Sequence, residues 1–234
     1  DIEGSIAHAT MLGRCGIIKQ EEADDIVQGL KGILADIENG TLHIDMEAED
    51  IHTFIEGELT KRIGDNGKRL HTSRSRNDQV AVDIKLYLKK EVVNVKKLVV
   101  DLIKVIADKA EKYSETVMPG YTHLQRAQPI TFGHHLLAYG EMLLRDVSRL
   151  EDCLKRMDEM PLGSCALAGT TYPIDRTITA ELLGFERITN NSLDGVSDRD
   201  YCIEFASVLS IIMVHLSRFS EEIIMWCSWE FKFI

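Results

Sequence analysis

Apolar residues recur every three or four positions along most of this chain, which is the spacing of one buried face of an α-helix. Residues 21–39 show the pattern first, and Gly40 after them suits a left-handed helix end. Residues 50–63 form a second, shorter candidate helix that Asp50 can cap. No stretch of convincing length alternates apolar and polar residues as a half-buried strand would. The pattern therefore predicts an all-α protein.

The helices predicted in the second part of the chain are longer. Residues 78–113 contain neither Pro nor Gly, and their apolar steps of three and four are typical of a bundle helix. Residues 131–157 repeat the pattern, and residues 200–233 are apolar over much of their circumference, as in the centre of a bundle or at a subunit interface. We predict a small N-terminal helical domain over residues 1–73 and a central long-helix bundle over residues 74–234. The apolar last helix favours oligomerisation.

Composition and charge argue against several kinds of partner and indicate the compartment. The 234 residues carry 27 Lys and Arg against 38 Asp and Glu, a net charge of −11, and no basic run appears. This charge argues against nucleic acid or an anionic membrane as a partner. The five cysteines are scattered without a Cys-x-x-Cys pair, which favours a reducing compartment such as the cytoplasm and no structural zinc. The apolar run 205–216 is too short to span a bilayer and predicts a buried helix.

Residues 120–129, Gly-Tyr-Thr-His-Leu-Gln-Arg-Ala-Gln-Pro, form a polar segment between two long predicted helices. The segment supplies the hydroxyl of Thr122, the imidazole of His123 and the amide of Gln125, and only the histidine can change charge near neutral pH. Polar loops held between rigid helices are usual places for reaction sites. A capped helix–helix turn with a solvated histidine is an equally good interpretation. In either case Pro129 can open the next helix.

Residues 71–79, His-Thr-Ser-Arg-Ser-Arg-Asn-Asp-Gln, come directly before the long predicted helix. Ser75, Arg76 and Asn77 would lie at its N-terminus, where unpaired backbone N–H groups and the positive end of the helix dipole also face a ligand. The segment predicts a carboxylate- or phosphate-binding site. The alternative is a helix cap built on one of its Ser, Asn or Asp side chains, with arginines on the surface.

Two further segments are less informative. Residues 161–171 are rich in small side chains that allow close backbone approach, and a tight helix crossing explains them better than direct chemistry does. Residues 190–200 contain several Asp and Asn side chains, for which capping or an ion pair with Arg199 is about twice as plausible as ligand binding.

Taken together, four segments in this order resemble argininosuccinate lyase, a family of the fumarase/aspartase superfamily. They are Thr-Ser-Arg-Ser-Arg-Asn-Asp-Gln at 72–79, Pro-Gly-Tyr-Thr-His-Leu-Gln-Arg-Ala-Gln-Pro-Ile at 119–130, Pro-Leu-Gly-Ser-Cys-Ala-Leu-Ala-Gly-Thr at 161–170 and Asp-Gly-Val-Ser-Asp-Arg-Asp at 194–200. The opening residues 1–9 and Glu-Asp-Ile-His at 49–52 fit as well. The resemblance covers essentially the whole chain.

The resemblance implies a reversible elimination that converts argininosuccinate into arginine and fumarate, with no metal and no organic cofactor. It also implies a homotetramer in which the central helical bundles pack together and three subunits build each active site. Removal of a proton from a carbon next to a carboxylate creates an aci-carboxylate with extra negative charge, which preorganised donors must stabilise.

The resemblance also assigns roles to individual residues. The residues that match family positions holding the fumarate-side carboxylates are Ser75, Arg76, Asn77 and Thr122. His123 matches the catalytic histidine, which transfers a proton near the departing guanidinium or relays one. His52 matches a further active-site histidine, and Gln125 a positioning residue. We therefore predict His123 and Thr122 as the catalytic pair, with the others binding substrate.

The chain departs from the family pattern at its ends. In the family, a Gly-Ser-Ser-x-x-Met-Pro loop that carries the proton-abstracting serine follows a stretch like residues 229–234. We expect that both ends are cut from a longer chain and that this polypeptide is inactive alone. Three alternatives stay open: another superfamily lyase such as adenylosuccinate lyase, a crystallin-like structural relative without activity, and a generic helical interaction module.

Overall fold

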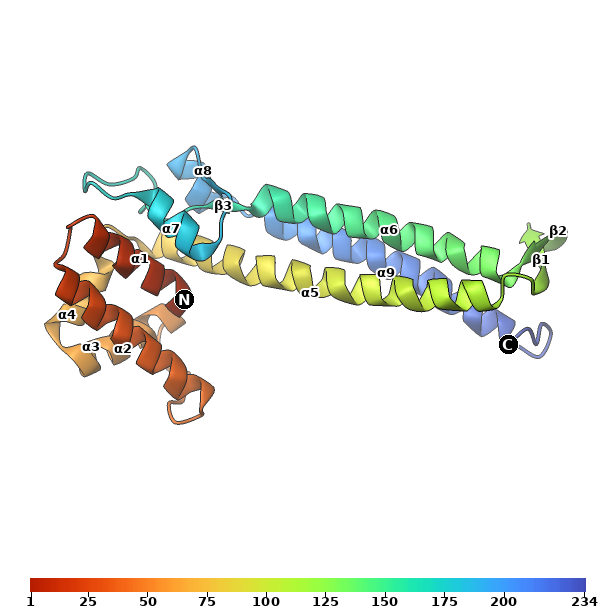
Figure 1. Cartoon of the computed structure of the whole chain (residues 1–234), viewed down its shortest axis with the longest axis horizontal. Helices are drawn as coiled ribbons and strands as arrows, with labels where there is room; N and C mark the ends of the chain where they lie inside the picture. Colours follow the sequence, from red (N-terminus) through yellow and green to blue (C-terminus); the bar gives the residue numbers. More distant parts are fainter. The chain divides into compact units, whose positions relative to one another are not determined.

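The computed structural model describes residues 1–234, which divide into two compact units. Unit 1 comprises residues 1–87 and 158–198, and unit 2 comprises residues 88–157 and 199–234. The predicted all-α class is confirmed, because helices form most of both units and the strands are short (Figure 1). The domain boundary at residue 73 stays a prediction.

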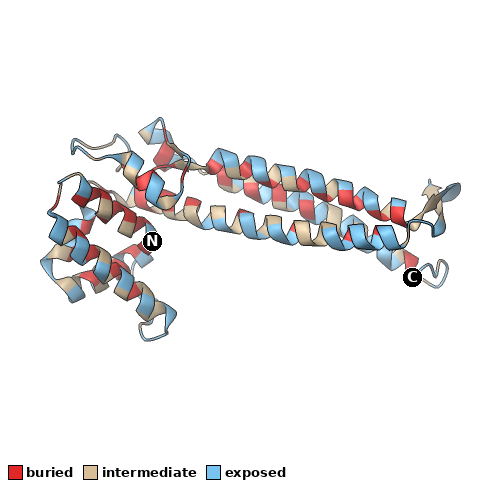
Figure 2. Ribbon diagram, viewed as in Figure 1, coloured by how far each residue is buried: buried red, intermediate tan, exposed pale blue.

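Unit 1 is a cluster of short helices around an apolar core. Its helices are α1 (Ile2–Arg14), α2 (Gln20–Glu38), α3 (Ile51–Ile63), α4 (Asp65–Lys68), the 3-10 turn η1 (Arg69–His71), the first turns of α5 (Arg76–Lys112), α7 (Arg176–Leu183) and α8 (Ser192–Ser197). The core side chains come from α1, α2 and α3 and include the fully buried Leu12, Ile26, Leu30 and Leu59. The predicted periodicity of residues 21–39 therefore marks a real buried face (Figure 2).

The sequence predicts several helix ends in unit 1 to within a few residues. Asp50 caps α3 by accepting a hydrogen bond from the Thr53 N–H at 2.6 Å. Gly40 has a φ of +73°, which is the left-handed conformation expected after α2. A second small core packs Val82 of α5 against α7, beside two short parallel strands, β3 (Glu159–Met160) and β4 (Arg187–Ile188).

Unit 2 is a bundle of three long helices: the later part of α5, α6 (Phe132–Met157) and α9 (Asp200–Trp226) (Figure 1). At one end of this bundle an aromatic cluster joins the three helices. Phe132 lies 5.4 Å from Tyr113 and 5.5 Å from Trp226 between ring centroids, and Tyr139 stacks on Phe219 at 4.5 Å.

The segment between α5 and α6 is not the loop that we predicted. Strands β1 (Val117–Thr122) and β2 (Gln125–Thr131) form an antiparallel hairpin, and α6 begins at Phe132. Pro129 therefore lies in β2 opposite Pro119 and does not open a helix. The hairpin escaped prediction because its strands are mostly exposed and show no apolar–polar alternation.

Helix α9 also differs from the prediction for residues 205–216. Phe205, Val208 and Ile212 are buried, whereas Met213 and Val214 are 61% and 57% exposed, so the run is buried on one face only. By length and composition α9 is apolar enough to cross a membrane, a test that core helices of soluble bundles also pass.

A close contact between α5 and α6 gives a test of the packing in unit 2. A Cβ atom on Gly133 would lie 2.3 Å from the Ala110 carbonyl oxygen, so we expect Gly133→Ala to destabilise the protein by about 1–3 kcal/mol through overpacking. Gly140→Ala in the same helix is the matched control, because its Cβ would meet only Ile106 Cγ2 at 3.7 Å. Thermal denaturation measures both variants, and equal melting temperatures would contradict the contact.

Candidate functional site

The structure places the predicted site residues in two groups. His52, Ser75, Arg76 and Asn77 belong to unit 1, whereas the group formed by Thr122, His123 and Gln125 belongs to unit 2.

Ser75 begins α5 with a reciprocal cap. Its hydroxyl accepts a hydrogen bond from the Asn77 N–H at 3.3 Å, while Asp78 Oδ1 accepts one from the Ser75 N–H at 2.9 Å. This is a capping box built on Ser and Asp. The capping interpretation of the segment is therefore confirmed for Ser75, and ligand binding by its hydroxyl stays a prediction.

Asn77 and Asp78 connect the start of α5 to the small-residue segment 161–171. Asn77 Nδ2 donates to the Ala166 carbonyl at 2.8 Å, and Asp78 Oδ2 accepts from the N–H groups of Gly163 and Cys165 at 3.0 and 2.8 Å. Burial raises the pKa of Asp78, and the three N–H donors oppose this effect. Two of the four segments that resemble the lyase family, 72–79 and 161–170, are thus joined by direct hydrogen bonds.

Arg76 is held by side chains of α3 and of its own helix. Its Nε lies 3.2 Å from Asp50 Oδ2, and its Nη1 donates to Glu56 Oε1 at 3.2 Å and to Gln79 Oε1 at 2.6 Å. Nη2 makes only a long contact of 3.4 Å to Thr53 Oγ1. The side chain is about one third exposed, and Nη2 has the weakest contact of its nitrogens, so an anionic ligand would bind at Nη2.

Arg74 is not a surface arginine, contrary to the alternative reading of this segment. Its side chain is 1% exposed, and its guanidinium donates to Ser5 Oγ at 2.8 Å and to Glu56 Oε1 at 3.3 Å. Burial lowers the pKa of Arg74 to about 10, although the Glu56 carboxylate opposes the shift. Burial also disfavours the charge of Glu56, but a hydrogen bond from His71 and the two arginines keep the pKa of Glu56 below its usual value.

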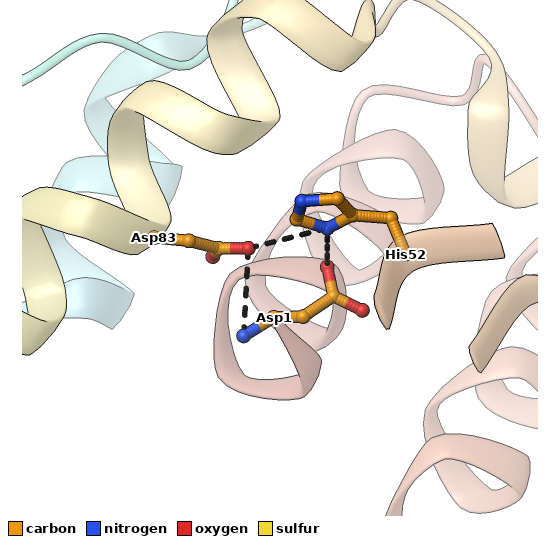
Figure 3. A group of neighbouring side chains, drawn as sticks. All are labelled: Asp1, His52 and Asp83. Atoms are coloured by element: carbon orange, nitrogen blue, oxygen red, sulfur yellow. Dashed lines mark hydrogen bonds and ion pairs between the residues drawn. The ribbon is translucent and has the colours of Figure 1, made fainter. Parts of the chain in front are cut away.

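His52 lies between two carboxylates (Figure 3). Its Nδ1 is 3.0 Å from Asp1 Oδ1 and 3.5 Å from Asp83 Oδ2, and the backbone nitrogen of Asp1 is 3.5 Å from the same Asp83 oxygen. Burial lowers the pKa of His52, and the Asp83 charge opposes this. Ligand atoms of the three side chains lie within 4.8 Å of one another, close enough to share a metal ion. The arrangement equally suits a histidine whose Nδ1–H is fixed by a carboxylate, which leaves Nε2 as the acceptor.

His8 is a buried histidine of α1, and its surroundings predict a pH dependence of stability. Its Nε2 donates to the Thr72 carbonyl at 2.9 Å. Burial, helped by the Arg74 charge, lowers the pKa of His8 from 6.5 to about 3. Below pH 6.5 the unfolded chain binds a proton that the native chain does not, so the stability present above pH 6.5 is lost as the pH falls toward 3.

When the pH falls from 7.5 to 5.0, we expect the buried His8 to lower the free energy of unfolding by about 2 kcal/mol. His8→Gln cannot titrate but keeps an N–H donor for the Thr72 carbonyl, so it should lose less stability over this range than the parent chain. Urea denaturation at the two pH values measures the difference. Equal losses in both proteins would show that His8 does not resist protonation.

The second group lies at the tip of the β1–β2 hairpin. Thr122 pairs with Gln125, and His123 and Leu124 form the two-residue turn between them, with φ angles of +52° and +58°. Such turns usually contain Asn or Gly, because other side chains are strained at positive φ. Thr122, His123 and Gln125 are all exposed. Residues held at strained backbone angles cluster at functional sites, which is a reason to test His123 for a function.

Sequence reasoning missed Glu56, which contacts both Arg74 and Arg76. A signal was present, because Glu56 follows His52 by four residues and therefore lies on the same face of α3. The role of Asp1 could not be found in this way, because its contact with His52 joins positions 51 residues apart.

Comparison with known proteins places the chain in a family. A family model described as Lyase matches residues 1–234, which is the entire chain. The chain belongs to this lyase family. The resemblance to argininosuccinate lyase is confirmed by curated relatives of that name from Desulforamulus reducens and Heliobacterium mobile, with 61% and 62% identity over all 234 residues. The chain spans about half the length of the curated relatives it matches, 51% in both cases.

Solved structures agree on the fold. An EDDS lyase variant with bound fumarate aligns with a TM-score of 0.89 and 32% identity, over 99% of this chain and 45% of the other. A class II fumarase from Schistosoma mansoni aligns with a TM-score of 0.81 over 97% of this chain and 56% of the other. At 16% identity the fumarase supports the fold alone. The predicted helical bundle of the fumarase/aspartase type is confirmed.

Proposed function

We propose that the protein of which this chain forms part is an argininosuccinate lyase, which cleaves argininosuccinate reversibly into arginine and fumarate. The observation that carries the proposal is the identity of about 60% with curated argininosuccinate lyases over every residue of the chain. The structure supports the assignment locally, because the Arg76 side chain is about one third exposed at the N-terminus of a long helix, where an anion can bind.

Each side chain has a place in this chemistry. When the proton leaves the carbon next to a carboxylate, negative charge moves onto the carboxylate oxygens, and Arg76 with the N–H groups at the start of α5 can stabilise that charge. Asn77 and Thr122 add neutral donors, and Ser75 fixes the helix start from which they act. His123 transfers a proton near the leaving guanidinium. His52 accepts a hydrogen bond through Nε2, and Gln125 orients substrate beside Thr122.

We further propose a cytoplasmic homotetramer in which subunits share each active site. In support, the long helices of unit 2 expose many large apolar side chains, which water does not favour. They include Leu98, Val105, Leu137, Leu144, Ile203, Met213, Val214 and Ile224. Sedimentation of the full-length protein tests this, and a stable monomer with full activity would contradict the shared site.

Turnover by the full-length protein tests the reaction itself. We expect argininosuccinate to be cleaved, with fumarate formation followed by its ultraviolet absorbance, and adenylosuccinate to be left intact. Cleavage of adenylosuccinate alone would assign another superfamily activity. A tetramer that cleaves neither substrate would instead be a non-catalytic relative of the crystallin kind. Residues 1–234 alone serve as the comparison, and we expect them to be inactive.

A further inference from the structure

Gln79 is a buried polar residue of unit 1 to which the reaction assigns no role. It lies in the first turn of α5, three residues after Arg76, and is 1% exposed. A buried amide is costly unless its donors and acceptor are paired, so its partners indicate what it does.

Both ends of the Gln79 carboxamide meet a charged group. Its Oε1 accepts from Arg76 Nη1 at 2.6 Å, and its Nε2 donates to Asp1 Oδ1 at 2.7 Å. A guanidinium can only donate and a carboxylate can only accept, so the orientation of the amide is fixed. A carboxylate or an ammonium in its place would satisfy only one of the two neighbours.

Asp1 extends this chain of hydrogen bonds to His52. The same Oδ1 atom that accepts from Gln79 lies 3.0 Å from His52 Nδ1 (Figure 3). Arg76, Gln79, Asp1 and His52 therefore form one continuous series of contacts between α5, the start of α1, and α3.

The contacts of Arg76 show why its orientation needs this support. Asp50 holds Nε, whereas Nη1 is shared between Glu56 and Gln79. Of these, the bond to Gln79 is the shortest. With Nε and Nη1 occupied, Nη2 has only the 3.4 Å contact to Thr53 Oγ1, so it is the nitrogen left for a substrate carboxylate.

We propose that Gln79 is a positioning residue that aims Arg76 at a substrate carboxylate and couples it, through Asp1, to His52. This inference rests on the proposed lyase function. It concerns the geometry of the carboxylate site, so wild-type turnover of argininosuccinate tests the function separately.

The test is a double-mutant cycle in the full-length protein. Gln79→Met keeps the length of the side chain and removes both hydrogen bonds, and we expect kcat/KM for argininosuccinate to fall about 10–100-fold, the usual cost of losing a supporting residue. If Gln79 acts through Arg76, adding Gln79→Met to Arg76→Ala should reduce kcat/KM by less than about twofold further. Fumarate inhibition should weaken in Gln79→Met and in Arg76→Ala alike.

Two outcomes would overturn the proposal. One is a full multiplicative loss of kcat/KM on adding Gln79→Met to Arg76→Ala, and the other is unchanged kinetics with only a lower melting temperature. Gln28→Met, at an exposed position of α2, is the matched control and should leave kcat/KM unchanged. If Gln79→Met does not fold, Gln79→Ala carries the same cycle, because it also removes both hydrogen bonds and adds no unpaired polar group.

Discussion

Replacing His123 by asparagine in the full-length protein is expected to lower kcat for argininosuccinate by about 10²–10⁴-fold, the usual contribution of a general acid–base group. The physical reason is that a carboxamide can hydrogen-bond but cannot take up or release a proton near neutral pH. Asparagine also tolerates the positive φ of 52° at this position better than most residues, so the hairpin turn should survive. The measurement is steady-state kinetics by fumarate absorbance.

His134→Asn is the matched control for this substitution. His134 is exposed in the first turn of α6, close in sequence to the hairpin but outside its turn. We expect its kcat to match that of the parent protein. If His123→Asn changed only thermal stability, the interpretation of the segment as a turn with a solvated histidine would be the correct one.

Replacing Arg76 by alanine is expected to reduce kcat/KM by about 10²–10³-fold, as for the loss of one donor that stabilises transition-state charge. The loss should divide between KM and kcat, because the guanidinium would hold the substrate carboxylate before and after the proton leaves. Arg76→Lys keeps the charge but not the fork, so it should recover only part of the activity. Competitive inhibition by fumarate reports ground-state binding separately.

Arg76→Ala also needs a control for lost stability, because it leaves the carboxylates of Asp50 and Glu56 with fewer partners. Arg62→Ala removes an exposed arginine that pairs with Asp36, a contact worth about 0–1 kcal/mol, and should leave kinetics unchanged. If Arg76→Ala left ligand binding and turnover intact, the chain would be a helical interaction module, with the segment serving only as a cap.

The sequence predicts the helical scaffold well because periodic burial is a local property. The apolar face of residues 21–39 and the long helix from 78 to 113 need only spacing to be seen, and the structure has them as α2 and α5, displaced by one or two residues at each end. The hairpin turn could not be predicted in this way, because His123 and Leu124 stand where Asn and Gly normally mark a two-residue turn.

The candidate site is predictable only in part, for a related reason. Ser75, Arg76 and Asn77 stand out as a polar cluster before a helix, and their place at the start of α5 follows from the sequence. The side chains that hold Arg76 do not, because Glu56 and Asp50 reach it from α3, 20 or more residues away along the chain. Their assignment required the packing of α3 on α5 inside unit 1.

Asp78 joins two parts of unit 1 that are far apart in the sequence. Its carboxylate binds N–H groups that follow it by 85 and 87 residues, so those two bonds close a long loop, which costs chain entropy. The amide protons of Gly163 and Cys165 are consequently shielded from solvent deuterium by a side chain of α5, and their exchange reports the opening of that helix's first turn.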